Sequence, residues 1–513
     1  MKGSSAVLAK TYSAALIGVQ ATVVEVEANI GAGLPGVYIV GLADTSISES
    51  RDRMKTAMNN SGLPWPKTKV IVNLSPASLP KSGSHFDLSI LTAILAAAAR
   101  DELVDSRFAH TMFLGEVGLD GTIKPVRGVI PALLAAREAG LRQCVVPAAN
   151  ADEAALIADF PVLYAADLTD VVDWAFGRKD LPLVNPQMPD CPPAQLDMAD
   201  VAGQPEARLA AEIAAAGGHH MMLVGPPGSG KSMIAARLPG LLPALQANEC
   251  LEASAVHSVV GSGLSGPVVQ APYVSLHHSV TSSQLIGGGS GHPKPGAVSL
   301  AHHGVLFLDE VSEIPAPILD SLRTPMETGA VRMMRNHREI VFPAQFQLVL
   351  AANTCRCGSE DPTACTCGAT ARQRYLSNVS GPLRDRIDLF VKTHARGAVL
   401  GRAESEPTSI IAERVMQARL RAEHRWRRAG LTTLLNARVN PHLLRREYPA
   451  DDVAMAYLSA LLADGQLSQR GVDRTLKVAW TLTDIAGADQ PTLDQVAHSI
   501  DLHIGAAELG VPL

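Results

Sequence analysis

The stretch His220-Met-Met-Leu-Val-Gly-Pro-Pro-Gly-Ser-Gly-Lys-Ser232 decides the fold of the middle of this chain. An apolar run, residues 220–224, leads into a glycine-rich turn that fits the P-loop pattern, and a strand followed by such a turn begins a nucleotide-binding α/β domain. In this pattern, backbone N–H groups cradle phosphates, Lys231 reaches the terminal phosphates and Ser232 binds magnesium. The predicted phosphate-binding residues are Gly225, Pro226, Pro227, Gly228, Ser229, Gly230, Lys231 and Ser232.

A second motif, Val305-Leu-Phe-Leu-Asp309-Glu310, supplies the other half of such a site. It is an apolar strand that ends in two carboxylates. We expect Asp309 to hold Mg²⁺ and Glu310 to activate the attacking water as general base. A third strand, residues 346–351, ends near Asn353, which either orients this water or occupies an ordinary turn. The two motifs together predict ATP and Mg²⁺ as cofactors.

Length, charge and hydropathy limit the remaining possibilities. A chain of 513 residues is long enough for two or three domains. Its 44 basic and 50 acidic residues give a net charge of −6, so any contact with nucleic acid must be local. No apolar run is long enough to cross a bilayer, and the first residues lack a secretory signal. We therefore expect a cytoplasmic protein without a membrane partner.

Periodicity divides the chain into an α/β multidomain protein. The first segment alternates β-like runs (residues 21–28, 36–40 and 69–72) with helical ones (46–59 and 88–99). Prolines at 182, 186, 189, 192 and 193 mark a linker, and a helix at 205–216 precedes the P-loop strand. From about Ser405 the pattern is helical. We predict an α/β domain at 1–175, a linker at 176–196, a P-loop core with a parallel sheet at 197–395 and a helical lid at 396–513.

These motifs resemble the YifB/ComM family of magnesium-chelatase-related AAA+ ATPases, in which a Lon-protease-like domain precedes the ATPase. The resemblance rests on four segments: Ala215-Ala-Gly-Gly-His-His220, Ser299-Leu-Ala-His-His-Gly-Val-Leu-Phe-Leu-Asp-Glu310, a cysteine cluster, and Ser380-Gly-Pro-Leu-Arg-Asp-Arg-Ile-Asp388. It implies an N-terminal domain of the Lon-protease (ribosomal S5 domain 2-like) fold, an AAA+ core and a homo-oligomeric ring, expected to be a hexamer.

The resemblance also implies that a neighbouring subunit completes each active site. Arg386 matches the arginine finger, which would offset charge on the transferring phosphate. The alternative for Arg386 is a surface ion pair with a neighbouring aspartate, Asp385 or Asp388. Arg474 matches the second sensor arginine. Arg384 and Arg470 lie close enough in sequence to compete for these two roles.

The first domain resembles the proteolytic domain of Lon in Gly115-Glu-Val-Gly-Leu-Asp-Gly121 and Pro125-Val-Arg-Gly128. A Ser–Lys dyad needs a serine nucleophile and a lysine that accepts its proton. His85 stands at the nucleophile position, and Val129-Ile130 replace the lysine, so the domain is predicted to be non-proteolytic. Ser82 and Ser84 lie close to His85 in sequence and could supply the nucleophile, so a regulated protease is a third possible function.

Four cysteines cluster at Cys355, Cys357, Cys365 and Cys367. Four thiols are the number that tetrahedral zinc requires, but structural zinc sites more often space paired cysteines by two to four residues. Zinc and reduced loop thiols therefore remain equal alternatives. Histidines also occur as two adjacent pairs, His277-His278 and His302-His303. Adjacent histidines on one element point in different directions and no carboxylate partner is evident, so no metal site is predicted there.

Basic residues gather in two places. Arg332, Arg335, His337 and Arg338 fall between a helix and a strand, where related helicases place a hairpin that points into the central pore; a solvated hairpin is the alternative. The second group surrounds Trp426 and consists of Arg419, Arg421, Arg425, Arg427 and Arg428. These arginines do not share one helical face, which favours a solvated lid surface over a stripe that tracks phosphates.

The resemblance implies a ComM-like motor that acts on single-stranded or branched DNA and promotes branch migration while transforming DNA is integrated. Hydrolysis would swing Arg474 and the lid against the core and carry the hairpin along the pore. The alternative is a protein-remodelling ATPase like the chelatase subunit, against which the Lon-like domain argues. Salt-sensitive DNA binding would separate the two.

Overall fold

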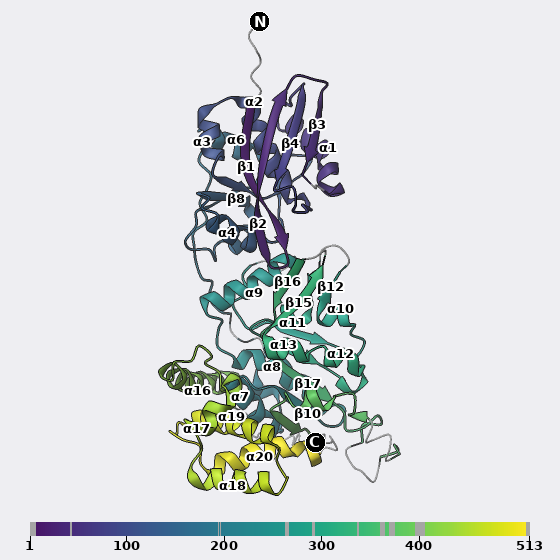
Figure 1. Ribbon diagram of the computed structural model, residues 1–513, viewed down its shortest axis with the longest axis vertical. Coiled ribbons are helices and arrows are strands. Elements are labelled where there is room, and N and C mark those ends of the chain that lie inside the picture. Colours follow the sequence, from purple (N-terminus) through teal and green to yellow (C-terminus); the bar gives the residue numbers. More distant parts are fainter. Residues whose placement is uncertain are drawn as a thin grey trace.

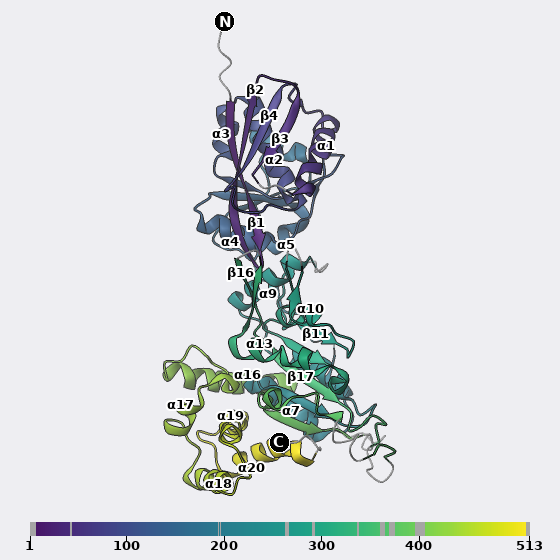
Figure 2. The same ribbon diagram turned by 45° about the vertical axis from the view of Figure 1, so that its right-hand side comes forward.

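A computed structural model describes residues 7–508 apart from 42–43, 193, 195, 262–265, 290–292, 336–337, 360–364, 369–374 and 395–405. The molecule is elongated, with a seven-stranded sheet at the N-terminal end, a five-stranded sheet in the middle and a group of helices at the other end (Figures 1 and 2). Pro193 and His337, which entered the sequence predictions, lie outside the described residues.

The seven-stranded sheet has the order β3-β4-β2-β1-β5-β8-β9. Its strands are β1 (Val7–Ile17), β2 (Gln20–Gly31), β3 (Gly36–Val40), β4 (Lys69–Ser75), β5 (Thr111–Phe113), β8 (Gln143–Pro147) and β9 (Val162–Ala165). The helices of this part are α1 (Thr45–Asn60), α2 (Asp87–Ala99), α3 (Glu102–Phe108), α4 (Val129–Glu138), α5 (Ala151–Ala154) and α6 (Leu168–Ala175). The sequence predicted β2, β3, β4, α1 and α2 but missed β1, which pairs with β2 along its whole length.

The five-stranded sheet is parallel throughout, in the order β11-β14-β17-β10-β18. Its strands are β10 (Met221–Val224), β11 (Tyr273–Leu276), β14 (Val305–Leu308), β17 (Gln347–Ala352) and β18 (Leu389–Lys392). β10, β14 and β17 are buried along their whole length, as expected for strands covered on both faces. The main helices of this part are α7 (Pro205–Gly217), α8 (Lys231–Leu241) and α9 (Ala247–Val260). The predicted strands at β10, β14 and β17 are confirmed.

Two hairpins leave this sheet. One pairs β12 (Gly287–Gly288) with β13 (Lys294–Pro295), and the other pairs β15 (Ala330–Arg335) with β16 (Arg338–Pro343). The second hairpin follows α13 (Arg323–Thr328), as the sequence predicted. It meets the N-terminal part of the molecule, because the guanidinium of Arg338 donates to the carbonyl of Ser78 at 2.8 Å and Gly18, in the β1–β2 turn, packs on Ile340.

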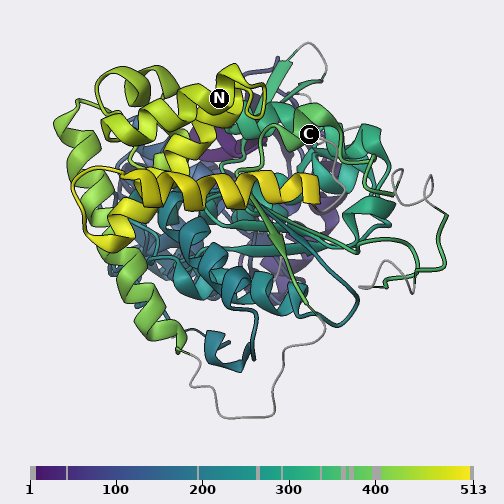
Figure 3. The same cartoon turned by 90° about the horizontal axis from the view of Figure 1, so that it is seen from below.

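The C-terminal part is helical, as predicted, with α16 (Thr408–Arg428), α17 (Pro441–Arg446), α18 (Asp452–Ala463), α19 (Gln469–Ala486) and α20 (Leu493–Glu508). Seen from below, α20 runs across the end of the molecule, where it lies against β18 (Figure 3). Pro441 begins α17 at a position where its missing N–H costs no helical hydrogen bond. None of the helices described here has the length and apolarity that a membrane span requires.

Candidate active site

The P-loop connects β10 to α8 at the carboxyl edge of the five-stranded sheet. Gly228 and Gly230 have φ values of 75° and 86°, in the left-handed region where side chains are disfavoured. Gly225 is needed for a different reason. A Cβ atom there would lie 2.1 Å from the hydroxyl of Thr393, at the end of β18. The glycines therefore allow the tight turn that ends at the N-terminus of α8, where backbone N–H groups can bind phosphate.

Lys231 is nearly buried in this loop. Its ammonium donates to the carbonyls of Gly225 at 2.9 Å and Pro226 at 2.8 Å, and to the side-chain oxygen of Asn353 at 3.2 Å. Burial lowers the pKa of Lys231, and the charge of Asp309 partly opposes this shift. The predicted lysine and the predicted asparagine thus meet, although Lys231 begins α8 and Asn353 follows β17.

The acidic pair lies beside the same helix. Ser232 donates to Asp309 at 2.9 Å, so the two predicted magnesium ligands are in contact. Glu310 has a φ of 50° and is half-exposed, and His278 lies 2.5 Å from its carboxylate. Sequence reasoning assigned His278 no role. It also missed Thr393, whose hydroxyl lies 2.7 Å from that of Ser229. Both residues follow strands, β11 and β18, that the sequence did not predict.

The two predicted arginines lie elsewhere. Arg386 precedes β18, and the N–H of Asp388 donates to the carbonyl of His220 just before β10, so this segment lies at the amino edge of the sheet. Arg474, on α19, reaches the same edge and donates to the carbonyl of Ile387 at 3.3 Å. Both arginines line a pocket of about 450 Å³ together with Arg438 and Lys477. The P-loop lies at the opposite edge.

The ion pairs around these arginines differ from the sequence-based alternative. Arg386 pairs with Glu327 of α13 rather than with Asp385 or Asp388. Asp388 instead pairs with the buried His219 at 2.9 Å, and this pairing helps to lower its pKa against the effect of burial. Asp385 forms an ion pair with Arg470 at 2.7 Å and lies 3.9 Å from the guanidinium of Arg474. Arg384 is partly buried, which lowers its pKa.

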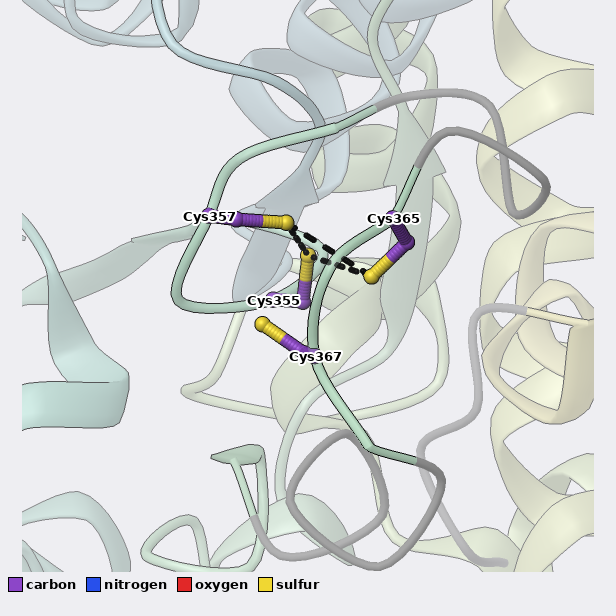
Figure 4. Close-up of side chains that lie close together, drawn as sticks. All are labelled: Cys355, Cys357, Cys365 and Cys367. Carbon is purple, nitrogen blue, oxygen red and sulfur yellow. Dashed lines mark hydrogen bonds between the residues drawn. The ribbon is translucent and has the colours of Figure 1, made fainter.

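The cysteine cluster forms directly after β17. The sulfur of Cys355 lies 3.2 Å from that of Cys357 and 3.6 Å from that of Cys365, and all four sulfurs lie within 4.8 Å of one another (Figure 4). The one-residue spacing therefore does not keep the paired thiols apart. All four cysteines are free thiols, so the geometry confirms the cluster and leaves zinc as a prediction.

The histidine pair has a carboxylate partner that the sequence analysis did not find, so that part of the reasoning was wrong. His302 and His303 both contact Glu252, at 3.1 and 2.9 Å. A metal is nevertheless disfavoured. The N–H of Gln345 donates to Nδ1 of His302, which leaves the proton on Nε2, the atom that faces Glu252. That nitrogen has no lone pair for a metal.

The arginine groups also find partners. In the β15–β16 hairpin, Arg332 pairs with Glu339 at 3.0 Å and remains largely exposed, and Arg335 approaches the carbonyl of Gly289 at 3.4 Å. On α16 the expectation of a solvated surface holds for Arg421, Arg427 and Arg428, which are exposed, and fails for Arg425. Trp426 is fully buried, and Arg425 stacks on Trp426 and Trp480 while pairing with Asp484. Three further members of the group also have partners: Arg419 donates to the carbonyl of Ala215, Arg421 to that of Asp484, and Arg427 pairs with Glu423.

The residues that could form a protease dyad are engaged elsewhere. Lys81 is buried and donates to the carbonyls of Gly41 at 2.9 Å and Leu74 at 3.0 Å, and Ser84 donates to Glu116. His85 is partly buried, desolvation lowers its pKa, and its ring contacts the carbonyl of Ala14 at 2.8 Å.

A P-loop and an acidic pair at the carboxyl edge of a parallel sheet, followed by a helical lid, define a P-loop protein of the AAA+ class. The family described as magnesium chelatase, subunit ChlI, matches residues 197–399, its C-terminal part matches 405–503, and subunit ChlI of Mg-chelatase matches 26–150. The competence protein ComM of Haemophilus influenzae is 38% identical over 94% of this chain and 95% of its own. The chain belongs to the YifB/ComM family of magnesium-chelatase-related AAA+ proteins.

Other relatives agree with this assignment. YifB of Escherichia coli K12 is 36% identical over 96% of both chains. An uncharacterized protein of Mycobacterium tuberculosis is 47% identical over 96% of this chain and 98% of its own. A Lon protease of Salinispora arenicola is 28% identical over 33% of this chain and 22% of its own, a partial likeness to Lon.

Proposed function

We propose that this protein is an ATP-hydrolysing, Mg²⁺-dependent motor that works in the cytoplasm as a homo-oligomeric ring, a hexamer, on single-stranded or branched DNA. Lys231 would exchange its carbonyl partners for phosphate oxygens, and Ser232 and Asp309 would hold the metal. Glu310 would take a proton from the attacking water, which Asn353 helps to orient. The likeness to ComM favours branch migration during the integration of transforming DNA.

The ring is supported by the placement of the arginines. Arg386 and Arg474 lie at the amino edge of the sheet, whereas Lys231 lies at the carboxyl edge. β10 has four residues, which span about 13 Å at 3.3 Å per residue, so the two groups are separated by the height of the sheet. A second subunit whose amino edge faces this P-loop would bring both arginines to the phosphates, where a guanidinium offsets developing charge.

The DNA substrate is supported by the β15–β16 hairpin. Arg332 is 61% exposed in its side chain, and its pair with Glu339 is a surface pair that costs little to exchange for a phosphate. Met334, near the tip, is 63% exposed. Exposed cations beside an apolar side chain suit a backbone-tracking contact with single-stranded DNA.

A protein-remodelling ATPase is the second candidate, because all three matched family descriptions are of magnesium chelatase subunits. One of them covers residues 26–150, so the presence of the first domain does not separate the two functions by itself. We further propose that this first domain is non-proteolytic, since Lys81 and Ser84 are engaged with other groups.

The test is steady-state ATP hydrolysis by the purified protein with no DNA, with single-stranded DNA and with a branched junction, each at two salt concentrations. DNA stimulation that weakens with salt is expected, because neutralised phosphates release counterions. An ATP hydrolysis rate that is the same without DNA, with single-stranded DNA and with the branched junction would favour the protein-remodelling motor. No hydrolysis under any condition would contradict the ATPase.

A further inference from the structure

The thiols of Cys355, Cys357, Cys365 and Cys367 have the arrangement of a metal site (Figure 4). Three sulfur pairs lie 3.2 to 3.6 Å apart, far beyond the roughly 2.05 Å of a disulfide bond. Around Zn²⁺ with bonds of about 2.3 Å, tetrahedral sulfur ligands stand about 3.8 Å from one another. Small side-chain adjustments therefore suffice to place one ion at equal distance from all four sulfurs.

The backbone explains how a one-residue spacing can supply two ligands. Gly358 has a φ of 72°, and its N–H donates to the carbonyl of Cys355 at 3.0 Å, which closes a turn. The hydroxyl of Thr354 donates a second hydrogen bond across the turn, to the carbonyl of Ser359 at 3.0 Å. The turn directs the thiols of Cys355 and Cys357 to one point instead of stretching them along a strand.

The same turn contacts the P-loop. A Cβ atom on Gly358 would lie 2.6 Å from Cδ of Pro227, so the backbone of Gly358 packs directly on the ring of Pro227. At the beginning of the turn, Asn353 accepts from Lys231, and one residue earlier the carbonyl of Ala352 accepts from the N–H of Gly225 at 3.1 Å. Residues 352–358 therefore flank the P-loop at three points.

We propose that the four cysteines bind one Zn²⁺ ion as thiolates and that this ion stabilises the P-loop through the turn that packs against it. Binding would form four Zn–S bonds and release four thiol protons to solvent, with no change in oxidation state. The ion would fix the turn that touches Pro227 and positions Asn353 beside Lys231. This inference rests on the proposed nucleotide site, because it assigns the metal a role in the affinity of that site.

The test combines metal analysis with nucleotide binding. Protein purified without added metal is analysed for zinc per chain, and its affinity for a fluorescent ADP analogue is measured before and after zinc removal by a membrane-permeant thiol-competitive chelator. We expect about one zinc per chain from the four-ligand count. Loss of the ion should weaken nucleotide binding on the order of tenfold, which corresponds to about 1.4 kcal/mol.

Variants separate the site from general thiol effects. Cys357→Ser and Cys367→Ser should each lose zinc and weaken nucleotide binding, whereas Cys191→Ser, an exposed cysteine outside the cluster, should change neither. Circular dichroism and a re-addition of Zn²⁺ to the stripped wild-type protein control for unfolding. Zinc-free protein as purified, or unchanged nucleotide affinity after zinc loss, overturns the proposal. Zinc-loaded protein that never binds nucleotide would instead contradict the proposed ATP site.

Discussion

Lys231 and Glu310 lie at the same edge of the sheet, but their surroundings predict two different failures. Lys231 is nearly buried among carbonyl oxygens, so Lys231→Ala removes the cation that phosphates need and should abolish nucleotide binding.

Glu310 is half-exposed, and Glu310→Gln keeps the shape of the side chain but removes the base. This variant should bind ATP and hydrolyse it about 10² to 10⁴ times more slowly. Binding of a fluorescent analogue and phosphate release measure the two effects. Wild-type turnover by Glu310→Gln would refute the base assignment.

His278 gives a second prediction for the same carboxylate. Its Nδ1 lies 2.5 Å from Glu310 and occupies the oxygen that would take a proton from water. His278→Ala should therefore raise ATP hydrolysis in the absence of DNA several-fold, because the base no longer has to break this hydrogen bond, worth about 1 kcal/mol. Phosphate release without DNA is the measurement, and His277→Ala, the adjacent histidine, is the matched control. A basal rate that falls in His278→Ala would show that the histidine supports catalysis instead.

The residues of the P-loop edge could be predicted only where a local pattern names them. Lys231 and Asp309 stand in motifs whose spacing reflects backbone geometry, and the structure places them where the motifs require. His278 and Thr393 follow short strands, β11 and β18, that carry no such motif. Their contacts with Glu310 and Ser229 depend on the lateral order of strands, which a single sequence does not encode in any local window.

At the scale of elements, the β15–β16 hairpin carries the prediction for DNA. Arg332→Ala and Arg335→Ala should each weaken single-stranded DNA binding and lower the slope of log affinity against log salt by about 1, as expected for one phosphate contact. The control is Arg427→Ala, an exposed arginine on α16 paired with Glu423. Fluorescence anisotropy at several salt concentrations measures both quantities. If Arg427→Ala changes the slope as much as the hairpin variants do, the hairpin is not the specific contact.

Helix α16 shows why an element can be predicted while one of its side chains is misjudged. Ala418, Ala422 and Trp426 repeat every four residues and form its buried face, a period the sequence displays. Arg425 lies beside that face, and its partners, Asp484 and Trp480, come from α19. Burial of an arginine needs a specific partner, and the partner lies 59 residues away. Helical periodicity alone therefore favoured solvent exposure for a side chain that is packed and paired.

At the scale of the whole molecule, the positions of Arg386 and Arg474 could not be read from their motifs. The sequence predicted that Arg474 moves with the lid against the core. The structure holds both arginines at the amino edge of the sheet, because α19 packs beside the segment that precedes β18. If Arg386 and Arg474 serve the reaction as proposed, its residues lie on opposite sides of a subunit, and such a site would be completed only by assembly with a second copy.

That division predicts complementation between inactive subunits. Lys231→Ala lacks a working P-loop but keeps its arginines, and Arg386→Ala has the reverse defect, so uniform rings of either variant should not hydrolyse ATP. A mixed ring contains interfaces where the P-loop of an Arg386→Ala subunit faces the intact Arg386 of a Lys231→Ala subunit. In random equimolar rings about a quarter of the interfaces have this composition, since each position is filled independently. Phosphate release should therefore reappear on mixing, provided that subunits are exchanged through a dissociated state.

Which mixtures recover ATP hydrolysis shows whether each arginine acts across the interface. If Arg474 also acts across the interface, Arg474→Ala mixed with Lys231→Ala should recover hydrolysis in the same way, whereas a group that serves its own subunit's P-loop should not. For such a group, the only subunits with an intact P-loop are those that carry the defective arginine, so every site in the ring lacks one component. If both arginines act across the interface, mixing Arg386→Ala with Arg474→Ala supplies the matched control, because the subunit that donates arginines to each interface then lacks one of the two and activity should stay absent. Recovery in that control would mean that one of the two arginines serves its own subunit's P-loop, and failure of both Lys231→Ala mixtures would contradict the shared site.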